Sequence, residues 1–290
     1  MSKEYIPAPI RLDWIMQHKK EDIPEVLEIR EKINSSFNDI VFKEDTHQYF
    51  LPKANNKELL SVSTMTHRFV PKVDWDEVCL NTANKIGVDF DKLKESWAYN
   101  NVKATNSGTH AHEYGESWFY FARGEVDKVL PAYKRQIEKG YFLPNFKKEE
   151  AIEKFYNWYF TQPALYGVFA ETQVYTEKYG YAGTFDLLMY YKHPMDDTKS
   201  GLIIFDYKTN ADIHNKFNRD KGNTLLPPFE NFIDEAESHY AMQLSAYQIP
   251  LEDIGLKVIG RRLIWIKDDG TFELIKIPNL TTKLRMALGG

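Results

Sequence analysis

The chain has 290 residues, 43% of them hydrophobic and 27% charged, with a formal net charge of -5. This length suits one large domain or a domain with a smaller lobe. The lone cysteine, Cys79, excludes an intrachain disulfide framework and a cysteine-based zinc site, and it fits a reducing cytoplasm. The charged N-terminus predicts no signal peptide, and no apolar run approaches the roughly 20 residues of a membrane span, so we expect no membrane partner. The negative charge argues against a general polyanion binder, because phosphate contacts need Lys and Arg.

The first part of the chain is predicted to be mainly helical. Either Ser61 or Ser63 suits the N-cap of a short helix, and the polar run "NVKATNSG", closed by Gly108, predicts an interruption between two helices. A strong amphipathic helix follows later and ends at Pro163. The predicted elements are helix over 1–40, strand and turn over 40–52, helix over 61–69, mostly helix over 74–121 with a gap at 101–108, and helix over 147–162.

The pattern then changes to strands. "GVFAETQVYTEK", "GYAGTFDLLMYY" and "SGLIIFDYKTN" read as three successive strands joined by short polar connections. Residues 232–255 read as a helix with a break near Pro250, and residues 261–278 as a hairpin turning at Asp269 and Gly270. This order predicts an α/β (α+β) fold with a central mixed sheet flanked by helices. We expect residues 1–60 to form an N-terminal helical and strand extension, and residues 61–290 one compact domain.

Two of the predicted strands carry buried charge. Asp186 and Asp206 lie inside apolar runs on neighbouring strands, and strands lie roughly 4.8 Å apart, so the two carboxylates repel unless a cation sits between them. Asp206 and Lys208 are two residues apart and share one face of their strand, whereas Tyr207 faces away. The pattern fits a Mg²⁺ or Mn²⁺ site beside a fixed ammonium. It also fits a salt bridge between Lys208 and Asp186, or two exposed strand charges, because the short motif is common in proteins.

Other residues could complete such a site. Glu171 lies on the preceding strand and can add a third carboxylate. His112 and Glu116 are four residues apart on one helix face, and a neutral histidine is a normal metal ligand. Gln243 and Tyr247 have the same spacing on the helix after the strands. Each of these residues alone is also typical of an ordinary helix face or core.

Taken in order, these segments resemble the PD-(D/E)XK nuclease superfamily, in particular its RecB-type branch, which includes lambda exonuclease. The matching motifs cover about residues 60–250. They are "GTHAHEYGE" on a helix, "AETQV" on a strand, "AGTFD", "FDYKT" and "QLSAY", preceded by "SVSTMTHRF", which looks like the family's Ser-Val-Thr helix start. The proline of the family name is absent, because Phe185 precedes Asp186.

The resemblance implies a restriction-endonuclease-like core and assigns a role to each matched residue. It makes His112, Asp186, Asp206 and the carbonyl of Tyr207 ligands of one Mg²⁺ or Mn²⁺ ion. Glu171 would bind a second ion or its waters, and Lys208 would orient or deprotonate the attacking water and stabilise charge on the phosphate. Gln243 and Tyr247 would position the lysine and the DNA backbone. His110 competes with His112 as the ligand, and the single cysteine excludes the branch's iron–sulfur cluster.

The implied function is hydrolysis of DNA phosphodiester bonds by a metal-dependent exonuclease in recombination, repair or replication. Such an enzyme suits a phage or a bacterium and would act in the cytoplasm. The resemblance makes Ser63 and Thr64 candidates for contacting DNA, and Lys216 and Arg219 in the basic run "HNKFNRDK" are candidates for guiding a strand. Two alternatives stay open: an inactive nuclease-fold module that only binds nucleic acid or protein, and an endonuclease on the same core.

Overall fold

A central mixed sheet organises the structure, a computed structural model that describes residues 19–43, 46–125, 128 and 146–289. Within these residues the strand order is β1-β2-β3-β5-β6-β7-β8, with β4 paired to β5. Strand β5 pairs parallel to β3, β6 pairs parallel to β7, and the other pairs are antiparallel. The predicted mixed sheet, its three-strand meander and the C-terminal hairpin are confirmed. The strands are β1 (Val41–Lys43), β2 (Gln48–Leu51), β3 (Lys57–Ser61), β4 (Leu165–Thr176), β5 (Tyr181–Tyr191), β6 (Gly201–Lys208), β7 (Val258–Ile266) and β8 (Phe272–Lys276).

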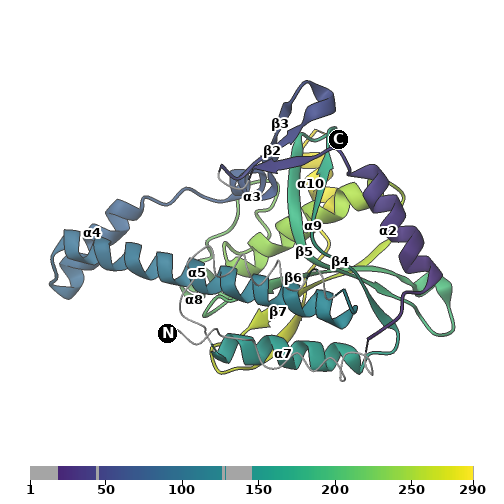
Figure 1. Ribbon diagram of the computed structural model, residues 1–290. Helices are drawn as coiled ribbons and strands as arrows, with labels where there is room; N and C mark the ends of the chain where they lie inside the picture. The colour runs from purple at the N-terminus through teal and green to yellow at the C-terminus, as the bar shows by residue number, and fades with distance from the viewer. Residues whose placement is uncertain (1–18, 44–45, 126–127, 129–145, 290) are drawn as a thin grey trace.

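Helices flank the sheet on both faces, as the sequence predicts (Figure 1). Helices α5 and α7 pack on one face, whereas α9, with α2, α3 and α10, packs on the other. The first residues of the predicted N-terminal helix, 1–18, lie outside the described residues. The helices are α2 (Pro24–Ser36), α3 (Val62–Thr66), α4 (Trp75–Ile86), α5 (Phe90–Ala122), α7 (Phe146–Phe160), α8 (Lys216–Lys221), α9 (Ala236–Asp253) and α10 (Thr281–Ala287).

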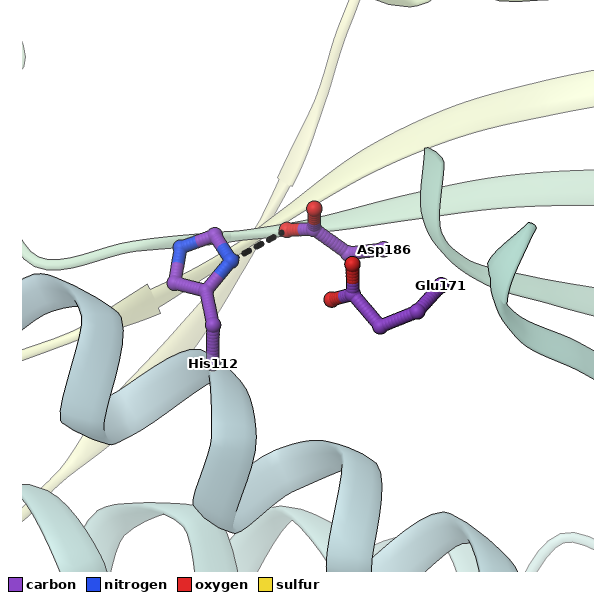
Figure 2. A group of neighbouring side chains, drawn as sticks. All are labelled: His112, Glu171 and Asp186. Atoms are coloured by element: carbon purple, nitrogen blue, oxygen red, sulfur yellow. Dashed lines mark ion pairs between the residues drawn. The ribbon is translucent and has the colours of Figure 1, made fainter. Parts of the chain in front are cut away.

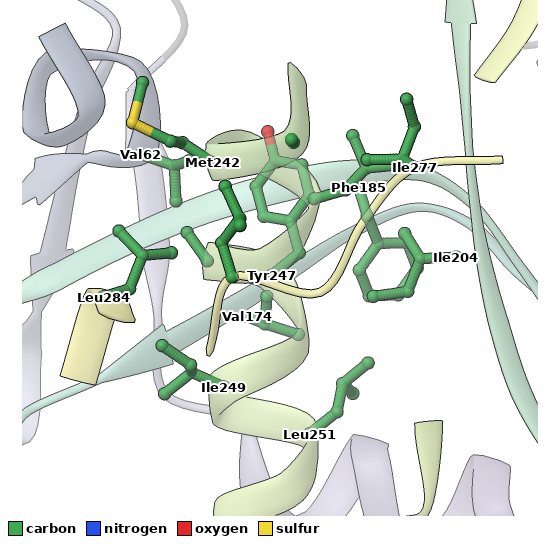
Figure 3. Close-up of a cluster of buried hydrophobic side chains, with 14 of the residues drawn as sticks. Val62, Val174, Phe185, Ile204, Met242, Tyr247, Ile249, Leu251, Ile277 and Leu284 are labelled. Atoms are coloured by element: carbon green, nitrogen blue, oxygen red, sulfur yellow. The ribbon is translucent and has the colours of Figure 1, made fainter. Parts of the chain in front are cut away.

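The core between α9 and the sheet is apolar. Phe185 and Ile204 of the sheet belong to the same cluster of buried side chains as Met242 and Tyr247 of α9 (Figure 3). Buried apolar area of this kind contributes about 25 cal/mol per Å², which makes it the main source of stability. Helix α9 is therefore held firmly against the strands that carry Asp186 and Asp206.

Helix α9 runs through Pro250 without the predicted break. Proline lacks the N–H that would bond to the carbonyl four residues earlier, here that of Ala246. The hydroxyl of Tyr181 donates a hydrogen bond of 2.9 Å to this carbonyl, so a strand side chain supplies the missing donor. The sequence around Pro250 does not reveal this partner, because Tyr181 is distant in the chain.

Helix α5 is continuous from Phe90 to Ala122, so the predicted interruption at residues 101–108 is wrong. Asn, Ser, Thr and Gly are weak helix formers, but each costs at most about 1 kcal/mol relative to Ala, and both ends of the helix are anchored by packing. The N-terminal half packs against α4, and this pair extends beyond the sheet (Figure 1). The C-terminal half packs on the sheet and carries His112.

Two glycines in α5 lie close to strand β6 or to the residue that follows it, Thr209. A methyl group on Gly115 would lie 2.7 Å from the ring of Tyr207, and one on Gly108 would lie 3.3 Å from the hydroxyl of Thr209. The hydroxyl of Tyr156 donates to the Gly115 carbonyl at 2.8 Å and lies 2.8 Å from the hydroxyl of Tyr207. These contacts tie α5, α7 and β6 together and fix the height of α5 above the sheet.

The segment before residue 61 is joined to the rest of the protein through the sheet and the core. Strand β3 pairs with β5 at Leu60 and Ser61, and Val26 and Ile33 of α2 are fully buried in the α9-side core. Ser61 is the N-cap of α3, since its side chain accepts a hydrogen bond from the Thr64 amide at 3.1 Å. The described part of the predicted extension thus contributes to the same sheet as the predicted domain.

We predict opposite stability effects for alanine at the two glycines of α5. Gly115→Ala should lower the free energy of unfolding by about 1–3 kcal/mol, because the buried Tyr207 ring cannot move aside. Gly108→Ala should be neutral or stabilising by up to about 1 kcal/mol, because the helix gains propensity and Thr209 can rotate. Urea denaturation of both variants checks this pair, and equal effects would contradict the close approach at Gly115.

Candidate metal centre

The candidate site lies where strand β5 changes its neighbour. Along one edge, β5 pairs with β6 over residues 187–191 and with β3 at residues 181–182, and Asp186 lies at the end of the β6 pairing. Its Oδ2 atom accepts a hydrogen bond of 2.7 Å from the backbone amide of Tyr207. The carboxylate thus takes the place of the backbone carbonyl that would accept this hydrogen bond if the β5–β6 pairing continued. This bond fixes Asp186 between the two helical layers.

Glu171 lies directly across from Asp186 on strand β4. The strand pairs Ala170–Leu187 and Thr172–Phe185 flank this position. The backbone of Glu171 has a φ of 47°, in the left-handed region that non-glycine residues seldom adopt. Residues 185 and 187 belong to core clusters on opposite faces of the sheet, so the usual alternation of the strand shifts here. The irregular backbone turns both carboxylates toward α5. Strain of this kind is concentrated at functional sites.

His112 completes a three-residue group with these carboxylates. Its Nδ1 atom forms an ion pair of 3.2 Å with Oδ2 of Asp186. Figure 2 shows the imidazole reaching from α5 toward the two carboxylates. One potential ligand atom from each of His112, Glu171 and Asp186 lies within 4.8 Å of the others. Three predicted metal ligands from distant parts of the chain therefore converge.

The charges in this group depend on one another. Burial alone would lower the pKa of His112, but the adjacent Asp186 carboxylate outweighs burial and raises it. Burial would raise the pKa of Asp186, but the neighbouring His112 outweighs burial and lowers it. The imidazolium thus offsets the carboxylate charge, and a divalent cation bound between the same groups would take over that role.

Asp206 and Lys208 lie beside this group, on the face of the sheet toward α9. Asp206 is 1% exposed, and its carboxylate forms an ion pair with Lys208. The Lys208 ammonium contacts Oδ2, whereas Oδ1 has no hydrogen-bond donor among the described residues. Burial, and then the charge of Asp186, raise the pKa of Asp206. Lys208 therefore pairs with Asp206, and the structure shows neither the Lys208–Asp186 salt bridge nor the two exposed strand charges that the sequence left open. The Oδ1 atom of Asp206 keeps capacity for a cation.

The predicted pair on α9 also faces the site. The Nε2 atom of Gln243 donates a hydrogen bond of 2.9 Å to the hydroxyl of Tyr247. Burial, and after it the charges of Asp206 and Asp186, raise the pKa of that phenol. A methyl group on Gly183 would lie 2.6 Å from the Tyr247 ring, so this glycine permits α9 to approach β5. The contact of Gln243 or Tyr247 with the lysine stays a prediction, as does the Tyr207 carbonyl as a ligand.

Sequence reasoning missed Tyr240, the aromatic contact of the lysine. The Lys208 ammonium lies 4.5 Å from the centre of the Tyr240 ring. The available signal was helical spacing, because Tyr240 precedes Gln243 by three residues and Tyr247 by seven. All three therefore lie on one face of α9.

His110, the competing ligand, belongs elsewhere. It is buried, and its Nε2 atom lies 2.8 Å from a carboxylate oxygen of Glu149 on α7. Glu116 is also buried, near the Tyr156 and Tyr207 phenols, whose pKa is raised mainly by burial and slightly by the charge of Glu116. The geometry thus favours His112 as the metal ligand, and His110 joins the two helices on that face.

The four residues predicted to contact DNA lie in two places: Ser63 and Thr64 at a surface pocket, and Lys216 and Arg219 on α8. Ser63 and Thr64 line a surface pocket of about 500 Å³ together with Tyr49, whose hydroxyl lies 3.1 Å from that of Thr184 on β5. Lys216 is exposed at the start of α8. Arg219 is bound to Glu235 through contacts of 2.7 and 2.6 Å.

His214, Glu235 and Glu237 form a second group of potential ligands, but Arg219 already contacts both carboxylates. Arg219 therefore anchors α8 in the described structure. A bidentate arginine–carboxylate pair satisfies Glu235 without a metal ion.

Comparisons with known proteins add no relative: no protein-family model matches the chain, and no curated protein matches it. The nuclease resemblance therefore stays a prediction based on the motifs. Among the described residues, no helix is long and apolar enough to span a membrane.

We predict that the two histidines differ in their effect on Mn²⁺ binding. His112→Ala should raise the Kd for Mn²⁺ at least about tenfold, a loss that even outer partners of a metal site can cause. His110→Ala is the matched control: it should leave the Kd unchanged and instead lower the free energy of unfolding by about 1–3 kcal/mol, because Glu149 loses a buried partner. Isothermal titration calorimetry and urea denaturation measure the two effects. Equal Mn²⁺ binding by the wild type and His112→Ala would contradict the site.

Proposed function

We propose that the protein is a Mg²⁺- or Mn²⁺-dependent deoxyribonuclease that acts as an exonuclease in DNA recombination, repair or replication. The observation that supports this best is the convergence of His112, Glu171 and Asp186, with Asp206 and Lys208 beside them. These residues come from four elements and are those that the motif resemblance singles out. We also propose that the protein acts in the cytoplasm, which the single cysteine, a free thiol, supports.

The donor set suits a hard divalent cation. Carboxylate oxygens are the ligands that Mg²⁺ and Mn²⁺ prefer, and imidazole is compatible with Mn²⁺. Asp206 supplies a buried carboxylate whose Oδ1 atom has no hydrogen-bond donor among the described residues, and a cation would satisfy this atom. When bound, such an ion supplies Lewis-acid polarisation of the phosphate and lowers the pKa of a coordinated water. Asp186, Asp206 and His112 would hold it, and Glu171 would hold a second ion or its waters.

Lys208 provides the fixed positive charge of the proposed site. Burial acts to lower its pKa, but the carboxylates of Asp206 and Asp186 outweigh burial and raise it. A lysine that stays protonated stabilises charge that develops on a phosphate and can orient a water through its N–H groups.

The proposed substrate is DNA, and the residues predicted to contact it include few basic side chains. Lys216 and Arg219, the predicted strand-guiding pair, are both exposed, but the Arg219 guanidinium is already paired with Glu235. Ser63 and Thr64 line their pocket together with Tyr49, and the Tyr49 hydroxyl lies 3.1 Å from that of Thr184, two residues before Asp186 on β5. This contact supports the pocket as the place for a nucleotide of the bound strand.

We predict that Asp206→Ala and Lys208→Ala lower DNA cleavage by about 10²–10³-fold or more, the cost of removing one electrostatic partner of a phosphoryl transition state. Circular dichroism should show an unchanged fold. Asp196→Ala is the matched control. Asp196 lies in the loop between β5 and β6, where it accepts a hydrogen bond of 3.0 Å from the Thr198 amide. It should retain full activity. Wild-type cleavage rates in Asp206→Ala or Lys208→Ala would contradict the assignment.

We predict that cleavage with Mg²⁺ requires a DNA end. Linear single- and double-stranded DNA should be degraded to nucleotides or short products, whereas covalently closed circles should persist. Gel electrophoresis and release of acid-soluble product measure both. Cleavage of closed circles would indicate an endonuclease on the same core. Binding of Mn²⁺ without cleavage of any DNA would favour an inactive nuclease-fold module.

A further inference from the structure

Lys208 has two contacts of different kinds. Its ammonium forms an ion pair with the Asp206 carboxylate and lies 4.5 Å from the centre of the Tyr240 ring. A cation at this distance from an aromatic face is attracted by the ring quadrupole, and the attraction increases when both groups are shielded from water. The side chain of Lys208 is 13% exposed, so its contact with Tyr240 is largely shielded.

Tyr240 is itself held in place by a short chain of hydrogen bonds. Its hydroxyl donates to Oδ1 of Asn210 at 2.5 Å, and the indole Nε1 of Trp265 donates to the Asn210 carbonyl at 2.8 Å. Trp265 is the residue of β7 that pairs with Lys208 of β6. The ring is thus fixed by the same pair of strands that carries the lysine, and it does not depend on the lysine for its position.

The two contacts of Lys208 affect Asp206 differently. An ammonium paired with Asp206 competes with a divalent cation for the same carboxylate oxygens, since both are attracted by one negative charge. An ammonium held against an aromatic ring stays close to the site without using a carboxylate. The ammonium makes both contacts at once in the described structure, so the ring contact is the one that remains when a metal ion takes the Asp206 carboxylate.

We propose that Tyr240 is a positioning residue: its ring holds the Lys208 ammonium when a divalent metal ion takes the Asp206 carboxylate. This inference rests on the metal site of the proposed function, but not on cleavage of DNA. Removal of the ring leaves Asp206 as the described partner of the lysine, so the ion pair becomes a stronger competitor of the metal. Metal affinity should fall for a reason that acts only through Lys208.

A double-mutant cycle on the full chain tests this, with the Kd for Mn²⁺ measured by isothermal titration calorimetry. Tyr240→Leu should raise the Kd about three- to tenfold, and Tyr240→Phe, which keeps the ring, should stay within about twofold of the wild type. Lys208→Met should bind Mn²⁺ at least as tightly as the wild type. Adding Tyr240→Leu to Lys208→Met should then change the Kd by less than about twofold, because the competing ammonium is gone.

Two results would overturn the proposal. One is an unchanged Kd in Tyr240→Leu, and the other is an equal loss of affinity when Tyr240→Leu is added to Lys208→Met, which would make the ring a structural support of the ligands. Tyr240→Met replaces Tyr240→Leu if the latter does not fold by circular dichroism. Failure of the nuclease proposal is recognised separately, because the wild type would then bind Mn²⁺ without cleaving DNA and the cycle would still be readable.

Discussion

The hydrogen bond from the Tyr207 amide to the Asp186 carboxylate is the interaction on which the candidate site depends. A backbone N–H buried at the point where β5 changes its neighbour from β6 to β3 needs an acceptor, and the 2.7 Å contact with Asp186 supplies one. It fixes a charged group in the plane of the sheet, which apolar side chains line on both faces. The remaining charged residues are arranged around that fixed carboxylate.

The second requirement is that each helical layer approach this point closely. On one face, Gly115 lets α5 lie against the Tyr207 ring, and this brings His112 within 3.2 Å of Asp186. On the other face, Gly183 lets Tyr247 of α9 lie against β5. Both approaches occur where a side chain larger than hydrogen would collide with an aromatic ring. The glycine in the "AGTFD" motif thus has a packing role that is independent of any chemistry.

Much of the site could be predicted from sequence, because a charged residue inside an apolar strand is conspicuous and motif order adds the partners. Asp186, Asp206, Lys208 and Glu171 are on the predicted strands, and His112 is on the predicted helix. Three features depended on tertiary contacts. The left-handed backbone of Glu171 breaks the two-residue period, the Tyr181 hydroxyl lets α9 pass Pro250, and Tyr240 contacts Lys208 across the gap between helix and strand. Helical spacing puts Tyr240 on the same face as Gln243 and Tyr247, but it does not identify Lys208 as the contact of Tyr240.

The balance of charge at the site bears on how a DNA strand could be held there. Three carboxylates, Glu171, Asp186 and Asp206, face one lysine and one histidine, so the group has a net charge of about -1 with the histidine protonated. A phosphate diester brings a further negative charge and is repelled by this group. A divalent cation reverses the sign and becomes the largest local charge. Under the proposed function, metal binding therefore precedes productive binding of the scissile phosphate. Lys208 and Tyr240 affect how readily Asp206 binds the metal ion, so they also affect how readily the site binds its substrate.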